Sequence, residues 1–145
     1  ACCPRSCRLP QGWDTIAEAD YLKKIVGVFK DAGIRVSIFL DPIVGLVKAA
    51  KDCGTDRIEL YTEAYAKAYK DNKEQAVRDY VAAAQQAANL GLGLNAGHDL
   101  DLNNLQYFAA QLPNLQEVSI GHALISDALY YGLQNTVQLY KRQLG

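Results

Sequence analysis

Both histidines of this chain follow a glycine at the end of a short apolar run. His98 follows Gly97, His122 follows Gly121, and a segment with helical spacing comes after each pair. Because the carboxyl ends of parallel strands meet at one edge of a sheet, where such folds keep their active sites, we expect the two pairs to lie close together. Glycine lets a backbone N–H approach an anion, and imidazole can carry a proton near neutral pH. The repeated dipeptide predicts a phosphate site with an acid/base group; the simpler alternative is a strand end with a buried histidine in each case.

Four apolar runs, each followed by a helical pattern, predict βα units and a parallel sheet. We expect the strands at residues 35–40, 57–61, 93–96 and 117–120. Helices are expected at residues 15–32, 43–52 and 73–90, between Asp101 and Pro113, and at residues 124–144 with a break at Gly132. Asn72 is placed to cap the third of these helices, with Gln75 three residues later.

The predicted units imply an α/β fold. Four βα units with right-handed crossovers correspond to half of an eight-unit barrel, which needs about 250 residues when it is closed. An open four-stranded sheet with helices is the alternative. With 145 residues and 50% hydrophobic content, the chain is expected to form a single domain over residues 1–145. A half-barrel leaves two sheet edges uncovered, so we expect a homo-oligomer.

Glu59 is a third candidate for chemistry, because it stands inside an otherwise apolar strand. Strand alternation points it away from Ile58 and Leu60. In a barrel those two residues would face the helices and Glu59 would face the interior, where a carboxylate is costly unless it binds something. We favour a functional role over the alternative, an internal salt bridge to Arg35.

The remaining polar residues near the strand ends have a structural interpretation as well. We expect Asp41 to cap the helix that follows Pro42, and Asp99 or Asp101 to cap the helix after His98. After His122, a short helix would aim its N-terminal amides at an anion.

Composition excludes several classes of partner. A net charge of −1 with scattered basic residues predicts no nucleic-acid binding. No apolar stretch is long enough to span a bilayer, so we expect no membrane partner and a cytoplasmic location. Cys2, Cys3 and Cys7 lack the paired spacing of a zinc site, and no metal is expected there. The chain starts at Ala1 without any methionine, so we expect a fragment, with residues 1–11 atypical or disordered and residues 12–145 forming the half-barrel.

Four phrases together resemble one family, pyridoxine 5'-phosphate synthase of vitamin B6 biosynthesis. The phrases are DAGIRVSIFLDP at residues 31–42, RIEL at 57–60, NAGH at 95–98 and SIGHALI at 119–125. They occur in the order of the family, and the similarity runs from about residue 12 to residue 144. Each phrase alone is weakly specific, whereas the four in sequence are specific.

The resemblance implies strands five to eight of a (β/α)8 barrel. Such enzymes condense 1-deoxy-D-xylulose 5-phosphate with 3-amino-2-oxopropyl phosphate to pyridoxine 5'-phosphate, releasing phosphate and water, and they imply no cofactor or metal. The small phosphorylated substrates would therefore be the partners of this chain. By the pattern of the family, His98 is the proton donor and Glu59 stabilises the transition state. The substrate or product phosphate would lie at Gly97, Asp99, Gly121 and His122.

The chain departs from the family pattern in three ways. Asp99 stands where the family usually has glycine, and its carboxylate is expected to weaken phosphate binding. The triplet Tyr61-Thr62-Glu63 replaces the His-Thr-Gly of the family. The first three strands, with an Asn-Asp-His signature and the general bases, are absent, so we expect no ring closure by this polypeptide alone.

Two other functions are open on the sequence. One is another phosphosugar-processing barrel enzyme, related to those of histidine or tryptophan biosynthesis, that shares the phosphate site by fold alone. The other is a half-barrel that binds a phosphorylated ligand without catalysis or pairs with another half.

Overall fold

The computed structural model describes residues 12–145 as a succession of βα units. The cysteines Cys2, Cys3 and Cys7 and the segment of residues 1–11 lie outside the described residues. The strands are β1 (Ser37–Leu40), β2 (Arg57–Tyr61), β3 (Gly93–Gly97) and β4 (Leu115–Ser119). The helices are α1 (Ala19–Asp31), α2 (Val44–Asp52), α3 (Glu63–Ala68), α4 (Lys73–Asn89), α5 (Leu105–Gln111), α6 (His122–Tyr131) and α7 (Leu133–Arg142).

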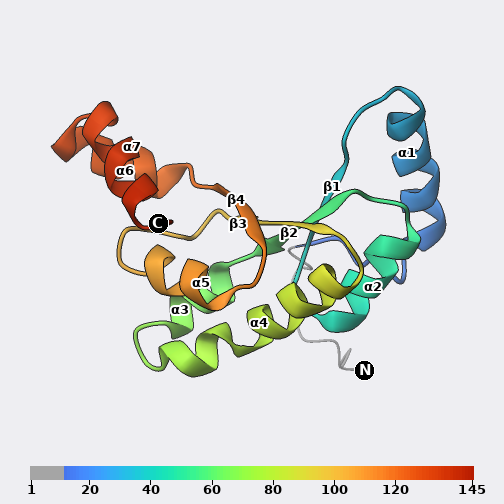
Figure 1. Cartoon of the computed structure of the whole chain (residues 1–145), viewed down its shortest axis with the longest axis horizontal. Helices are drawn as coiled ribbons and strands as arrows, with labels where there is room; N and C mark the ends of the chain where they lie inside the picture. Colours follow the sequence, from blue (N-terminus) through green and yellow to red (C-terminus); the bar gives the residue numbers. More distant parts are fainter. Residues whose placement is uncertain (1–11) are drawn as a thin grey trace, which may run out of the picture.

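Within residues 12–145 the strands form one parallel sheet in the order β1-β2-β3-β4. Helices α2 to α5 lie on one side of it, α1 stands beyond one end, and the α6–α7 pair stands beyond the other (Figure 1). The sequential strand order and the one-sided helical layer are those of half a (β/α)8 barrel, as predicted. All four strand predictions are confirmed, although β1 starts two residues later than expected and β4 starts two residues earlier.

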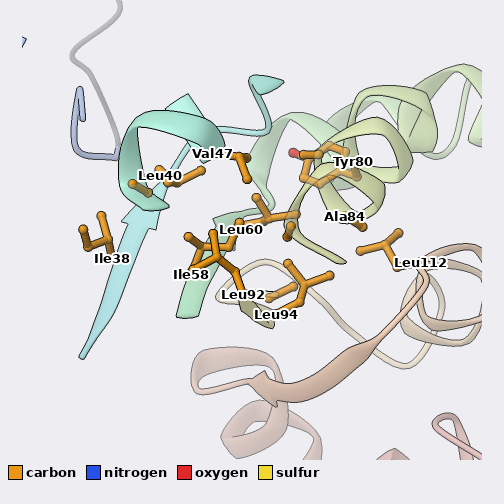
Figure 2. Packing of buried hydrophobic residues seen from close by; sticks show 14 of the residues in the cluster. Ile38, Leu40, Val47, Ile58, Leu60, Tyr80, Ala84, Leu92, Leu94 and Leu112 are labelled. Atoms are coloured by element: carbon orange, nitrogen blue, oxygen red, sulfur yellow. The ribbon is translucent and has the colours of Figure 1, made fainter. Parts of the chain in front are cut away.

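The apolar face of the sheet packs on the helices. Ile58 and Leu60 of β2 are fully buried and belong to one cluster with Leu94 of β3 and with Val47 and Tyr80 of the helices (Figure 2). The prediction that Ile58 and Leu60 face the helices is therefore confirmed. The alternation of the strand leaves Glu59 on the opposite, inner face.

A register irregularity in β3–β4 sets which residues of β4 reach the inner face. Leu94 pairs with Leu115, whereas Asn95 pairs with Glu117, so Gln116 is an extra residue on β4. The pairs after this bulge run through to Gly97 opposite Ser119. Without the bulge every later side chain of β4 would turn to the other face.

The helix ends follow the predicted caps in part. The side chain of Asn72 accepts a hydrogen bond from the Gln75 N–H at the start of α4, as predicted. The side chain of Asp101 accepts from the N–H groups of Asn103 and Asn104 in the turn before α5, but the N-cap of that helix is Asn104, so the expected cap by Asp101 is not formed. The expected cap by Asp41 is wrong. An extended Ile43 is the N-cap of α2 and makes no side-chain capping bond, so the helix begins too far along the chain for Asp41 to be its N-cap.

Two helical predictions need correction. The predicted first helix, residues 15–32, begins only at Ala19, because turns precede it and the Asp14 carboxylate accepts from backbone N–H groups in them. Helix α3 was not predicted, because six residues are too few to establish a helical period. The predicted break at Gly132 is confirmed, since this residue separates α6 from α7 with φ 76°. No helix within residues 12–145 has the length and apolar character that crossing a membrane requires.

Candidate active site

A cavity of about 400 Å³ lies at the carboxyl ends of the strands and gathers most of the predicted site. Its lining includes Glu59 of β2, His98 after β3, and Gly121 and His122 after β4. Phe39, Ser119 and Ile120 complete the wall. The expectation that the two Gly-His pairs meet at one edge is confirmed, because their imidazole rings lie 6.0 Å apart between centroids.

His98 sits at a strained turn. Its φ of 70° is in the left-handed region, and the Asp99 N–H donates to the Gly97 carbonyl across it at 3.0 Å, which makes a γ-turn with positive φ. Such a conformation costs a non-glycine residue about 1–3 kcal/mol, and it persists where the surroundings hold it. The His98 N–H donates to the Ser119 carbonyl at 2.8 Å, so β4 is one of those restraints.

Gly97 is required by the close approach of β3 to β4. A Cβ atom at this position would overlap the carbonyl group of Ser119, which is backbone and cannot move aside. The glycine thus serves strand packing at the same point where the family pattern assigns it to substrate. Gly121 differs, because a Cβ there would meet no heavy atom of the described chain within 4 Å.

The start of α6 supplies an anion-binding geometry. Gly121 is the N-cap and His122 the first residue of this ten-residue helix. The first amides of a helix have no intrahelical acceptor, and the helix dipole makes this end positive. His122 therefore stands beside N–H groups suited to a phosphate, at the mouth of the cavity that His98 and Glu59 also line.

Glu59 is held in an environment that favours its protonated form. Burial raises the pKa of its carboxyl, the negative charge of Glu117 raises that pKa further, and His98 lowers it. No ion pair to Glu59 forms within residues 12–145. A carboxyl whose protonated form is favoured, in the same cavity as an imidazole, can take part in proton transfer.

The salt bridge expected as the alternative for Glu59 is not formed. Arg35 instead lies 3.5 Å from Glu117, measured between Nη2 and Oε1. Arg35 stands before the pairing of β1 with β2, which begins at Ser37, and its side chain reaches across to β4. The alternative is therefore corrected: Glu117, and not Glu59, is the partner of Arg35.

The inner face also carries a polar network that the sequence analysis missed. The Arg57 side chain, only 10% exposed, lies 2.6 Å from Glu117 Oε1 and donates to Asn95 Oδ1 at 2.9 Å and to Gln116 Oε1 at 2.5 Å. The hydrogen bond from Arg57 lowers the pKa of the Glu117 carboxyl. Strand alternation could have predicted the position of Arg57, because it stands two residues before Glu59 and therefore lies on the same face of the sheet.

Asp99 faces the histidine. Its Oδ2 atom is buried, lies 3.2 Å from Nδ1 of His98 and has no hydrogen-bond partner among the described residues. Its N–H is engaged by the Gly97 carbonyl and by the Thr62 hydroxyl. Asp99 is thus not the helix cap that the sequence allowed. It is not among the residues that line the cavity, but its carboxyl lies against His98, which is.

Metal-ligating side chains are not clustered in the described part of the chain. Residues 12–145 contain no group of three or more His, Cys, Asp or Glu side chains placed to hold an ion. The groups available at the cavity are therefore two imidazoles, a carboxyl with a raised pKa and the amides of a helix start.

A comparison with solved structures supports the half-barrel fold. Among solved structures, the HMG-CoA lyase from Brucella melitensis, a (β/α)8-barrel enzyme, is similar with a TM-score of 0.56 at 20% identity, over 87% of this chain and 48% of the lyase. That likeness concerns the fold alone, and it supports the half-barrel over an open sheet.

The family follows from the sequence comparisons. Residues 8–145 match the family model described as pyridoxal phosphate biosynthesis protein PdxJ. The pyridoxine 5'-phosphate synthases of Cytophaga hutchinsonii and Flavobacterium johnsoniae are 59% and 54% identical over 133 residues. The chain belongs to the PdxJ family. It spans 56% of the length of these two relatives, and the match covers 92% of the chain.

The environment of Glu59 predicts a pH-dependent gain in stability on neutralising it. Because the pKa of Glu59 is raised in the folded chain, the ionised carboxylate destabilises the fold at any pH above that raised pKa. The cost disappears once the pH falls below the pKa of the carboxyl in the unfolded chain. Glu59→Gln should raise the free energy of unfolding at pH 7 by about 0.5–1 kcal/mol. The gain is small because solvent screens part of the cost of the ionised carboxylate. Urea unfolding at pH 7 and at pH 4 measures the difference, which should shrink towards zero at the lower pH.

Glu117→Gln is the matched control, and it should change the free energy of unfolding in the opposite direction. The pKa of Glu117 is lowered, so its stabilisation is present at neutral pH and disappears as the pH falls through the folded pKa. This variant should be less stable than the parent chain at pH 7. A destabilised Glu59→Gln variant at pH 7 would contradict the assignment of a costly inward carboxylate.

Proposed function

We propose that this chain carries the phosphate-binding and proton-donating half of a pyridoxine 5'-phosphate synthase active site. The observation that carries the proposal is the convergence of both Gly-His strand ends and Glu59 on one cavity at the start of α6. Membership of the PdxJ family and relatives named pyridoxine 5'-phosphate synthase support it.

Each group has a role that suits its position. His98 donates a proton in the imine, enol and dehydration steps of the condensation of 1-deoxy-D-xylulose 5-phosphate with 3-amino-2-oxopropyl phosphate. Glu59, whose pKa is raised by burial, stabilises charge as the ring forms. Gly121, His122 and the first amides of α6 bind the substrate or product phosphate, while Gly97 and Asp99 form its β3 side.

Asp99 sets the strength of phosphate binding in this proposal. A carboxylate beside the cavity repels an anion, and its N–H is already bound to Thr62 and Gly97. Asp99 therefore weakens phosphate binding relative to the glycine that the family usually has there.

The 145-residue polypeptide is proposed to bind phosphate without completing ring closure. By the pattern of the family, the general bases belong to the first three strands, which have no counterpart among its residues. A half-barrel that binds a phosphorylated ligand and never catalyses is the second candidate, favoured because the strands of residues 12–145 form a four-stranded sheet and not a closed barrel. No cofactor or metal is part of the proposal, and a cytoplasmic location remains a prediction.

Self-association is supported by the apolar side chains at both ends of the sheet. In α1, Val28 and Phe29 are exposed, and in α6 Leu129 and Tyr130 are 82% and 85% exposed. Burying such side chains against another polypeptide is favourable, so we propose that this chain associates with a second copy when it is alone in solution.

A chimera tests the catalytic half of the proposal. Residues 12–144 of this chain replace the matching part of the Cytophaga hutchinsonii synthase, and formation of pyridoxine 5'-phosphate from the two phosphorylated substrates is measured. The chimera should be active, and His98→Asn within it should lower kcat about 10²–10⁴-fold, because a proton donor is lost. A folded chimera without activity, or one indifferent to His98→Asn, would favour the candidate without catalysis.

Phosphate binding by the chain alone is tested by thermal unfolding. Inorganic phosphate should raise the Tm of the parent chain in a concentration-dependent way, because it binds only the folded state. Gly121→Leu should abolish the increase and leave the Tm without phosphate nearly unchanged, since a side chain there meets only open space in the described chain.

Asp99→Asn is the control for the same assay that should change phosphate binding in the direction opposite to Gly121→Leu. Removing the carboxylate should tighten phosphate binding several-fold and enlarge the increase in Tm. An unchanged response to phosphate in both variants would place the anion elsewhere on the molecule.

A further inference from the structure

Thr62 is a buried residue whose hydroxyl does not serve its own helix. It follows β2 directly, is fully buried and occupies the N-cap position of α3. A threonine at this position usually accepts a hydrogen bond from an N–H in the first turn of its helix. The Thr62 side chain makes no such capping bond.

The hydroxyl instead reaches across to the end of β3. It donates to the Gly97 carbonyl and accepts from the Asp99 N–H, with an oxygen–nitrogen distance of 3.2 Å. These two groups belong to the residues on either side of His98. One side chain therefore binds the entry and the exit of the strained turn, and it uses both its donor and its acceptor to do so.

The turn is otherwise held from β4 and from the residue before α5. The His98 N–H donates to Ser119, and the Asn104 side chain donates to the Asp99 carbonyl at 3.3 Å. Left without support on the β2 side, a residue with positive φ would relax towards an ordinary conformation and carry its imidazole away from the cavity.

We infer that Thr62 is a positioning residue for His98: its hydroxyl fixes the turn that places the imidazole over the cavity and opposite His122. Thr62 touches neither substrate nor phosphate in this role and acts only through the backbone of its neighbours. The effect on phosphate affinity rests on the proposed function, whereas the effect on the turn does not.

The test compares three variants of the full chain. Thr62→Val keeps the shape of the side chain and removes both hydrogen bonds, and Thr62→Ser keeps the hydroxyl. Thr15→Val is the matched control, because Thr15 is equally buried and its hydroxyl donates to the Leu46 carbonyl, away from the cavity. Thr62→Ala, which leaves more room, replaces Thr62→Val if the latter does not fold.

Two readouts are measured on each variant. The first is the hydrogen-exchange rate of the His98 and Asp99 amides relative to the core amides of Ile58 and Leu94. The second is the dissociation constant for inorganic phosphate. Thr62→Val should accelerate exchange at His98 and Asp99 about tenfold without a matching change in the core, and it should weaken phosphate binding by a similar factor. Thr62→Ser should stay within about twofold of the parent chain in both.

The inference is overturned if Thr62→Val and Thr15→Val have the same exchange rates at His98 and Asp99, or if Thr62→Ser loses as much as Thr62→Val. A parent chain that binds no phosphate would contradict the proposed function. The exchange rates would then still decide the role of Thr62.

Discussion

The pairing of β3 with β4 is the constraint on which the site depends. Its bulge at Gln116 brings Gly97 opposite Ser119, and the absence of a Cβ at Gly97 lets the two backbones approach. The Ser119 carbonyl then accepts the His98 N–H, while the chain beyond Ser119 turns into α6. A one-residue change of register would turn the β4 side chains after the bulge to the other face and separate the two Gly-His pairs.

The two faces of the sheet divide stability from chemistry. The outer face buries Ile58, Leu60 and Leu94 against helices, and this burial provides the rigid support for the strand ends. On the inner face, Arg57 neutralises Glu117, and Glu59 is left as the carboxyl whose ionisation is opposed by burial. A site that holds such a carboxyl gives up some stability for its function.

The sequence was sufficient for the order of the elements, because the strands alternate with helices long enough to show a period. It was also sufficient to bring His98, His122 and Glu59 together, because strand parity and the carboxyl edge of a parallel sheet are local rules. The β4 bulge, the partner of Arg35 and the strained turn at His98 depend on contacts between residues distant in the chain. The bonds of the Thr62 hydroxyl could not be predicted for the same reason, since its partners lie at the end of β3 and just after it. The short α3 was not predictable because six residues do not establish a helical period.

The central claim is that both Gly-His strand ends bind one anion, and the chain has only two histidines with which to test it. A titration with inorganic phosphate, followed by NMR on the Cε1 protons of His98 and His122, measures this most directly. If one anion contacts both imidazoles, both resonances should shift with a single common dissociation constant. A shift of only one resonance, or two different constants, would contradict this claim.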